Sequence, residues 1–222
     1  MKPTIAILGG TGDEGMGLGF RWAAAGYPVV IGSRVAERAI ATAVELTNQL
    51  GEVGGDHALV SGADNVAATA QAEIVVLSVP YSAQEATLTA VQAELAGKLL
   101  ISVVVPLQPP KVSHVWRPAA GSAAQEVQAQ LGEGARVVAA FQNVSAHHLR
   151  DLDHVVECDV LVCGDRKEDK QVAIELAAAA GLRGVDAGPL VNASIAEGFT
   201  AVLIGINIRH KIKDAGIRIT GI

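Results

Sequence analysis

The chain has 222 residues, of which 50% are hydrophobic but only 3% aromatic, and its formal net charge is -6. A chain of this length can form one core, or a main domain with a small appendage. Few aromatic side chains and an excess of acidic residues disfavour nucleic-acid binding, which depends on base stacking and positive charge. We therefore expect a small-molecule ligand and no nucleic-acid partner.

Two apolar stretches bear on the location of the protein. The first, Ile5–Leu8, ends at Gly9 and is too short for the hydrophobic region of a secretory signal. The longest, Phe199–Ile208, is interrupted by polar and small residues and falls short of the about 20 residues that span a bilayer. These stretches predict a soluble, cytoplasmic protein that binds no membrane.

A glycine-rich turn follows the first apolar run. Gly10, Gly12 and Gly15 have G-x-G-x-x-G spacing between a predicted strand and a predicted amphipathic helix. The first glycine allows a tight turn, the second lets backbone N–H groups approach a pyrophosphate, and the third lets the helix pack against the strand. Asp13 and Glu14 fall in the first helical turn, where they either cap the helix or lie beside the cofactor and oppose its charge. The pattern predicts a dinucleotide site.

The end of the second predicted strand discriminates between dinucleotides. An acid there would bind the ribose 2′-OH of NAD, whereas an arginine accommodates the 2′-phosphate of NADP. The chain has Ser33 and Arg34 at this position, with Arg38 one helical turn later. We therefore predict an NADP site.

Aliphatic runs continue to alternate with helical patterns along the chain. The runs predict strands at Ala58–Val60, Ile74–Val79, Leu99–Val105 and Val137–Phe141, with helices at Ser82–Leu95 and Ser122–Leu131. Such β-α-β succession implies parallel strands joined by right-handed crossovers. We predict an α/β fold of the Rossmann type, with a doubly wound, mostly parallel sheet.

A smaller part follows the predicted NADP-binding domain, which we assign to residues 1–142. Residues 143–222 are expected to form a small α/β extension that contributes to a second cofactor site and to dimer contacts. It contains a strand from Asp159, a helix over Lys167–Ala180, a short strand at Val185–Asp186 and a long helix over Ala193–Ile208. The last helix is apolar almost all round, so we expect it to be buried in the body or against a second subunit, and predict a homodimer.

Three predicted strands end in distinctive residues. Ser78, Val79 and Pro80 close one strand, Val105 closes the next, and Phe141–Ser145 follow the third. Carboxyl ends of parallel strands meet at the edge where the nicotinamide half of a cofactor lies. For Pro80 and Pro106, ordinary strand termination remains an equal alternative, and for Pro109 and Pro110 it is the preferred interpretation.

Several kinds of catalytic group are missing from the sequence. No nucleophile with its base and no metalloprotease motif is present. His147, His148 and His154 could be metal ligands, but adjacent histidines point in different directions and no Cys or acid completes a known spacing. We therefore expect a solvated loop there, no metal and no catalytic side chain. An enzyme that binds NADP but has no evident acid, base or metal could still transfer a hydride directly between two stacked cofactors, because orientation supplies most of the catalysis in that reaction.

Motifs along the whole chain resemble the F420H2:NADP oxidoreductases, small Rossmann proteins that pass hydride between NADP and the 5-deazaflavin coenzyme F420. The similarity includes ILGGTGDEG, VIGSR, LSVPY, the strand end VVVP, CGD, and GLRGVDAGPLVNA near the C-terminus. The resemblance implies that the cofactors are NADP and coenzyme F420, and that this chain is an enzyme of that type.

The resemblance also implies site residues. By this likeness NADP would be held by Thr11, Gly12, Ser33, Arg34 and Arg38, with Ser78 and Pro80 along the ribose and nicotinamide. The deazaflavin would lie near the loop with Gln142 and Asn143, and near Ala215 and Gly216. Some family members have His where this chain has Gln142, so Gln142 and Asn143 are expected to be positioning groups.

Two other functions remain open from the sequence. One is an NADPH-dependent reductase of a small imine or keto acid, such as the pyrroline-5-carboxylate reductases, whose extension is helical and would lack the strand DVLVCGD. The other is a non-catalytic sensor that responds to NADP occupancy.

Overall fold

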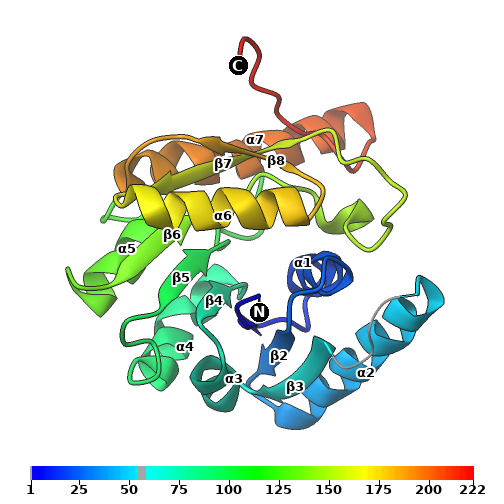
Figure 1. The fold of residues 1–222 in the computed structure, drawn as a ribbon. Coiled ribbons are helices and arrows are strands. Elements are labelled where there is room, and N and C mark those ends of the chain that lie inside the picture. The colour runs from blue at the N-terminus through cyan, green and yellow to red at the C-terminus, as the bar shows by residue number, and fades with distance from the viewer. Residues whose placement is uncertain (1, 55–58) are drawn as a thin grey trace.

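The computed structural model describes residues 2–54 and 59–222, which form one eight-stranded sheet flanked by helices (Figure 1). The strands are β1 (Ile5–Leu8), β2 (Val29–Ser33), β3 (Val60–Asp64), β4 (Ile74–Leu77), β5 (Leu99–Ser102), β6 (Arg136–Ala139), β7 (Asp159–Gly164) and β8 (Arg183–Asp186). The helices are α1 (Asp13–Ala24), α2 (Ala36–Glu52), α3 (Asn65–Gln71), α4 (Gln84–Val91), α5 (Ala123–Leu131), α6 (Lys167–Ala179) and α7 (Ala193–His210). Single 3-10 turns are η2 (Tyr81–Ala83), η3 (Ala146–His148) and η4 (Leu190–Asn192).

The strand order confirms the predicted fold class. It is β3-β2-β1-β4-β5-β6-β7-β8, and the first six strands are parallel. This is the doubly wound order with its crossover point between β1 and β4, where such folds bind their ligands. β7 runs antiparallel to β6, and β8 is parallel to β7, so the C-terminal strands extend the same sheet.

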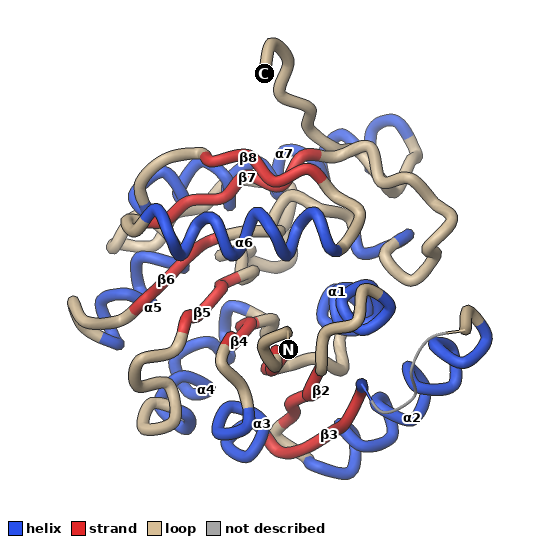
Figure 2. The backbone as a smooth tube through the Cα atoms, viewed as in Figure 1, coloured by secondary structure: helices blue, strands red, loops and turns tan. Residues whose placement is uncertain are grey.

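Each helix layer packs on one face of the sheet. Buried side chains of α1, α2 and α6 share one core cluster, and those of α3, α4, α5 and α7 share the other. Figure 2 shows α6 in front of β7 and β8, with α7 behind them. Both faces are covered, which explains why the strands are continuous aliphatic runs rather than alternating ones.

Strand boundaries differ from the sequence prediction in a consistent way. The runs Ile74–Val79, Leu99–Val105 and Val137–Phe141 leave the hydrogen-bonded ladder two to three residues before their apolar character ends. The apolar residues beyond each ladder form loops and cavity walls at the carboxyl edge of the sheet, so each apolar run is longer than its strand. The predicted strand Ala58–Val60 begins outside the described residues, and β3 starts at Val60. The sequence analysis did not identify α3, which has only 7 residues.

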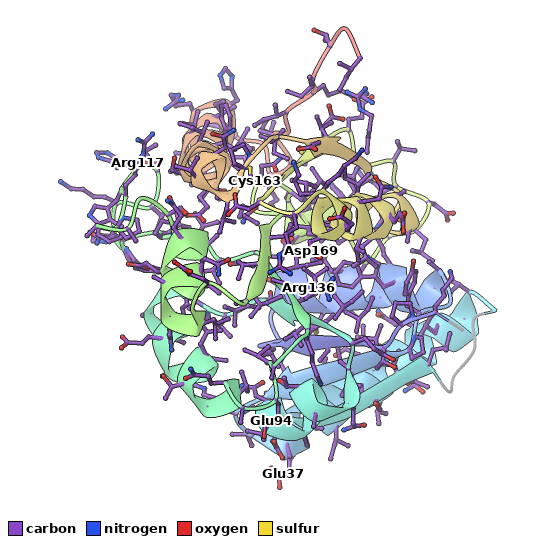
Figure 3. All side chains as sticks on the ribbon, turned by 60° about the vertical axis from the view of Figure 1, so that its left-hand side comes forward. Glu37, Glu94, Arg117, Arg136, Cys163 and Asp169 are labelled. Carbon is purple, nitrogen blue, oxygen red and sulfur yellow. The ribbon has the colours of Figure 1, made fainter. Side chains whose placement is uncertain are left out.

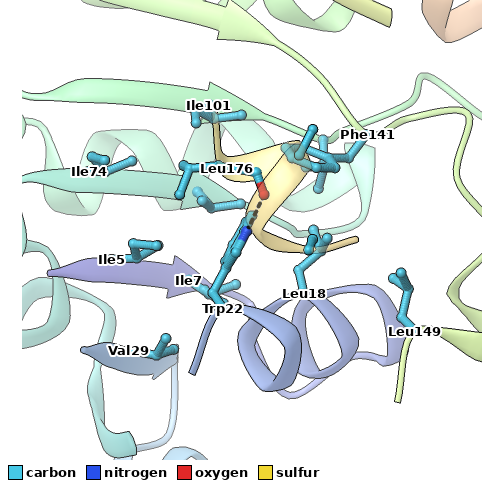
Figure 4. Packing of buried hydrophobic residues seen from close by; sticks show 14 of the residues in the cluster. Ile5, Ile7, Leu18, Trp22, Val29, Ile74, Ile101, Phe141, Leu149 and Leu176 are labelled. Atoms are coloured by element: carbon cyan, nitrogen blue, oxygen red, sulfur yellow. Dashed lines mark hydrogen bonds between the residues drawn. The ribbon is translucent and has the colours of Figure 1, made fainter. Parts of the chain in front are cut away.

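Trp22 joins the two halves of the chain in the core (Figure 4). Its indole Nε1 donates a 2.8 Å hydrogen bond to the carbonyl of Leu176 in α6. Its ring meets Phe141 edge-on, with centroids 5.7 Å apart. Phe141 is fully buried and has a φ of 73°, so the chain turns sharply after β6 and the ring is held against α1. These contacts fix α6 on the helix that starts at the glycine turn.

A partly buried ion pair makes a second connection between these parts. Figure 3 shows Arg136 of β6 beside Asp169 of α6. The guanidinium donates to Asp169 Oδ1 over 2.6 Å and 3.0 Å, and Asp169 is buried. The C-terminal part therefore docks through polar as well as apolar contacts.

The last helix is less buried than its composition predicts. In the best-matching apolar window of Leu190–His210, 33% of the residues are buried within the single chain. Over the described residues this segment alone is long and apolar enough to cross a membrane by length and composition, a test that helices of soluble proteins also pass. The body of the chain thus covers only part of α7, and its remaining apolar face is open in the single chain.

Candidate cofactor site

The glycines of the turn between β1 and α1 differ in what they do. The N–H of Gly10 donates to the carbonyls of Ile7 and Gly32, at 3.1 Å and 3.0 Å. A Cβ on Gly10 would lie 2.8 Å from the Ile7 carbonyl, and one on Gly15 would lie 2.8 Å from the Cα of Gly10. A Cβ on Gly12 would meet nothing closer than 3.7 Å. Two glycines therefore serve close packing, whereas the space over Gly12 is open to a ligand.

A further glycine, Gly9, was not singled out from the sequence. Its φ is +74°, and a Cβ there would lie 2.4 Å from the carbonyl of Ser78. The N–H of Ser78 donates to Leu8 across the β1–β4 pair. This close approach brings the glycine turn and the end of β4 together at the crossover point of the sheet.

A cavity of about 680 Å³ opens beside this turn; we refer to it as the crevice. Its lining comes from the carboxyl ends of β1, β4 and β5 and the segment after β5. The predicted residues in it are Gly12, Asp13, Glu14, Ser78, Val79, Pro80 and Val105, joined by Tyr81, Ser82, Val103, Val104, Leu107, Gln108, Pro109 and Val112. Mostly apolar walls with a few polar groups, at this volume, are typical of a small-molecule site.

Tyr81 forms a fixed part of the crevice wall. Its hydroxyl donates to Glu126 Oε1 over 3.2 Å, and its ring meets Trp116 edge-on with centroids 5.7 Å apart. Burial, and then the hydrogen bond and charge of Glu126, raise the pKa of Tyr81 to about 12. The side chain is therefore a neutral, oriented wall at ordinary pH.

Glu14 is the charged group most altered by this environment. Its Oε1 atom is buried and has no hydrogen-bond partner among the described residues. Burial raises the pKa of Glu14 from 4.5 to about 8. The carboxyl is thus protonated at neutral pH, so it can donate a hydrogen bond into the crevice. A protonated Glu14 carries no charge that opposes a pyrophosphate, which leaves the exposed Asp13 as the carboxylate of this turn.

The titration of Glu14 predicts a pH-dependent stability. Its pKa is raised on folding, so the folded chain binds more protons than the unfolded chain between about pH 4.5 and 8, and stability falls as pH rises through that window. Glu14→Gln keeps the shape and cannot ionise. Its stability relative to the natural chain should therefore rise by about 4 kcal/mol between pH 5 and 9, measured by urea unfolding. Exposed Glu37, in the first turn of α2, provides a control as Glu37→Gln; parallel pH profiles for Glu14→Gln and the natural chain would contradict the prediction.

Basic residues lie at the other end of the turn, past β2. Ser33 is buried, and its Oγ accepts a 3.2 Å hydrogen bond from the N–H of Val35. Arg34 and Arg38 are exposed, and neither forms an ion pair with any residue in the described ranges. Both guanidinium groups are therefore available to an anion beside the glycine turn.

Gln142 and Asn143 hold the sheet together after β6. Gln142 Nε2 donates to the carbonyl of Ser102 over 2.9 Å, and the backbone carbonyl of Gln142 accepts from Thr200 Oγ1 over 2.7 Å. Asn143 Nδ2 donates to the carbonyl of Asp159 over 2.6 Å. Both side chains are buried and neither lines the crevice. Their side chains tie the segment after β6 to the backbone of β5 and β7.

Ala215 and Gly216 lie elsewhere. They line a second cavity of about 430 Å³, together with Ser145, His148, His154, Val155, Val156, Glu157, Cys158 and Asp214. We call this the histidine cavity. A Cβ on Gly216 would lie 2.8 Å from the carbonyl of Glu157, so this glycine serves close packing. In the single chain these two residues are not brought together with the glycine turn.

The sequence of this chain is similar to those of known proteins. Residues 4–106 match a family described as NADP oxidoreductase, coenzyme F420-dependent. The chain is 42% identical over 230 residues to an F420-dependent NADP reductase of Methanothermobacter thermautotrophicus, covering 100% of this chain and 97% of the relative. It is also 42% identical over 222 residues to the enzyme of that name from Methanocaldococcus jannaschii, covering 98% of each.

Solved structures agree at the level of the fold. One from Arthrobacter sp. FB24, provisionally described as an F420-dependent NADP reductase, has a TM-score of 0.79 at 26% identity and covers 99% of this chain and 100% of its own. A pyrroline carboxylate reductase of Plasmodium falciparum shares the fold, with a TM-score of 0.55 at 14% identity, but only 58% of that chain is covered. The strand DVLVCGD, which a helical extension would lack, is present as β7. The chain belongs to the F420-dependent NADP reductase family.

Proposed function

We propose that this protein transfers a hydride between NADP(H) and coenzyme F420 by stacking the two rings directly in the crevice. As a member of its family it is an oxidoreductase that uses NADP and coenzyme F420. The observation that supports the stacking is the position of one mostly apolar cavity at the crossover point, beside the open face of Gly12.

The residues of the turn suit the phosphate groups of NADP. The backbone N–H groups of Thr11 and of the first turn of α1 lie where the helix dipole favours a pyrophosphate, whereas the N–H of Gly12 donates to the carbonyl of Gly9 over 3.2 Å. Ser33, Arg34 and Arg38 lie where a 2′-phosphate is bound in this fold. Protonation of Glu14 leaves only the exposed Asp13 as a carboxylate in the first turn.

The walls of the crevice suit two flat rings. Val79, Pro80 and Val105 present apolar surface on neighbouring strand ends, and Tyr81 closes one side. These side chains orient the rings and exclude water, which is how positioning alone accelerates a transfer. When both cofactors are bound, NADPH would supply the hydride from nicotinamide C4 and F420 would accept it at deazaflavin C5, with the accompanying proton taken from water. We assign the deazaflavin to the crevice and not to the histidine cavity with Ala215 and Gly216.

We propose that the two parts of the chain have different roles in the site. Residues 1–142 supply the glycine turn, the basic end of β2 and most crevice walls. Residues 143–222 support them through α6, β7 and α7, and supply contacts to a second copy. Thr200 of α7, which donates to the carbonyl of Gln142, is one such support.

A direct assay tests the function. Purified protein is mixed with NADPH and F420, and the deazaflavin absorbance is followed over a range of pH values. Loss of absorbance at a rate proportional to protein concentration supports the proposal. No loss, with tight NADPH binding retained, would favour a sensor. Turnover of NADPH with a cyclic imine or keto acid instead of F420 would favour the other reductase class.

We also propose that the protein is a soluble, cytoplasmic homodimer built on the open face of α7, without membrane or nucleic-acid partners. Val191, Ile195, Val202 and Ile206 recur on one face of the helix and the turn before it. Val191, Ile195 and Val202 are 56%, 50% and 42% exposed. An apolar stripe of this kind is typical of a contact between subunits.

Replacing Val202 with Asp is expected to dissociate the dimer. The carboxylate would have to be buried without a partner, so the dissociation constant should rise about 100-fold. Sedimentation velocity across a concentration series measures the change. Gln92→Asp, on an exposed residue after α4, adds the same charge away from the stripe and should leave the dimer intact. A monomeric natural chain, or one that sediments with lipid vesicles, would contradict the proposal.

A further inference from the structure

Arg21 of α1 organises a loop that is distant in sequence. Its Nη2 atom lies 3.2 Å from the carbonyl of His148, 2.6 Å from that of Asp151 and 3.2 Å from that of His154. The residue is buried, only 5% exposed. One guanidinium therefore fixes the backbone of three residues that are spaced three positions apart along the chain.

The side chains of the same three residues lie together. Each of His148, Asp151 and His154 offers one ligand atom, and these atoms all lie within 4.8 Å of one another. The two imidazole rings are nearly parallel, with centroids 3.8 Å apart and an angle of 18°. Arg21 thus holds the backbone of this grouping in place, and the stacked imidazole rings contact each other above it.

The donor set has the chemistry of a transition-metal site. Imidazole nitrogen and carboxylate oxygen are both ligands of zinc, at about 2.0 to 2.2 Å. Two such ligands on a tetrahedral ion lie about 3.4 Å apart, so the ligand atoms must come closer together than the 4.8 Å within which they now lie. Both imidazoles are half-buried and Asp151 is exposed, so an ion can enter from solvent through the histidine cavity.

A further carboxylate comes from the segment after α7. Asp214 Oδ2 lies 3.8 Å from His148 Nε2 and lines the same cavity. With Asp151 it supplies two negative charges, which offset the positive charge of Arg21 beneath the loop. It also brings a ligand from a different part of the chain, as structural metal sites commonly do.

We propose that His148, Asp151 and His154 form a binding site for a divalent transition metal of the zinc type, with Asp214 as the fourth ligand. From the sequence, His147, His148 and His154 were candidate ligands, but no Cys or acid completed a known spacing. The site instead uses two histidines six residues apart with an acid midway between them. The bound ion ties the segment after α7 to the loop anchored on α1, so its role is structural and separate from hydride transfer.

Titration of the purified chain with Zn²⁺ alone tests the proposal, by calorimetry and thermal unfolding. One equivalent should bind per chain, and a hundredfold excess over the dissociation constant should raise the Tm by about 5 to 10 °C. Co²⁺ should give the visible absorption bands of a four-coordinate site. Neither readout depends on NADP, F420 or turnover, so failure here leaves the proposed function untouched.

The Zn²⁺ affinities of single variants distinguish binding at this site from binding to other surface histidines. His148→Ala and His154→Ala should each weaken Zn²⁺ binding at least tenfold. His147→Ala, next to the site but outside the cluster, is the matched control and should bind as the natural chain does. His210→Ala, on the exposed end of α7, is a second control.

Asp151→Asn removes a metal ligand in a variant that is expected to fold normally. Asp151 Oδ1 accepts hydrogen bonds from the N–H groups of Asp153 and His154, at 3.1 Å and 3.2 Å, and an amide oxygen can replace it there. This variant should keep its fold by circular dichroism and still lose at least tenfold in Zn²⁺ affinity. Absence of saturable 1:1 binding to the natural chain overturns the proposal. Equal affinity in the natural chain, His154→Ala and Asp151→Asn also overturns it.

Discussion

Replacing Arg34 with Ala is expected to weaken NADPH binding by about 1.5 to 3 kcal/mol, or roughly 10- to 150-fold, because a charge-assisted hydrogen bond to the 2′-phosphate is lost. Arg34 is exposed directly after β2 and forms no ion pair with the residues that the structure describes, so its guanidinium has no competing acidic partner there. NADH lacks the 2′-phosphate, and its affinity should change by less than twofold.

Fluorescence titration with both nucleotides measures this selectivity. Arg38→Ala should show the same preference with a smaller loss, because Arg38 lies one turn further along α2. Arg166→Ala, an exposed arginine at the start of α6, removes an equal charge elsewhere and controls for long-range attraction. An equal loss of affinity for NADPH and NADH in Arg34→Ala would show that this residue does not recognise the 2′-phosphate.

Replacing Arg21 with Met is expected to lower the free energy of unfolding by about 3 to 5 kcal/mol. Arg21 contacts five buried or partly buried carbonyls: those of His148, Asp151 and His154, and in addition Leu149 at 2.7 Å and Ala180 at 3.0 Å. Methionine has a similar length and leaves all five acceptors without their donor, which costs more than the hydrogen bonds themselves contribute.

Urea unfolding measures the loss. Trp22→Phe provides a neighbouring control, because it removes the single hydrogen bond to Leu176 and should cost only about 1 kcal/mol apart from the change in ring size. Arg21→Lys keeps the charge but cannot reach all the carbonyls, so its stability should lie between the two. A loss below 1 kcal/mol in Arg21→Met would mean that water replaces the guanidinium and that the loop is not anchored by it.

The fold follows from local signals in the sequence. Buried parallel strands are continuous aliphatic runs, and the runs before Gly10 and before Ser33 mark β1 and β2 directly. The glycine spacing predicts the turn because each glycine has a steric reason that lies within a few residues or on the adjacent strand. Gly15, for example, packs on Gly10, five positions away.

Other features depend on residues that meet only in the folded chain. Arg21 was not singled out, since its acceptors lie 127 to 159 residues away. Its position in an otherwise apolar stretch, GFRWAA, was the available signal, because a charge on a buried helix face needs partners. Asp151 was not predicted as a ligand beside His148 and His154 for a similar reason. The H-x-x-D-x-x-H spacing brings the three side chains together only on a loop that is bent by the carbonyl contacts of Arg21.

The crevice wall beyond β5 was also only partly predicted. Val105 was expected there, whereas Leu107, Pro109 and Val112 were not, because the prolines were interpreted as strand termination. The open face of α7 could not be predicted either. An apolar composition is the same whether a helix is covered by its own chain or by a second copy, and only the packing of the chain distinguishes the two.

Transfer of isotope tests direct stacking most simply. The protein is mixed with F420 and NADPH that carries deuterium at the transferred position of nicotinamide C4, and the reduced F420 is analysed by mass spectrometry. Direct transfer in the crevice predicts one deuterium retained at C5 of the deazaflavin, independent of solvent. Reduced F420 whose new hydrogen comes from water, or no reduction at all, would contradict the account.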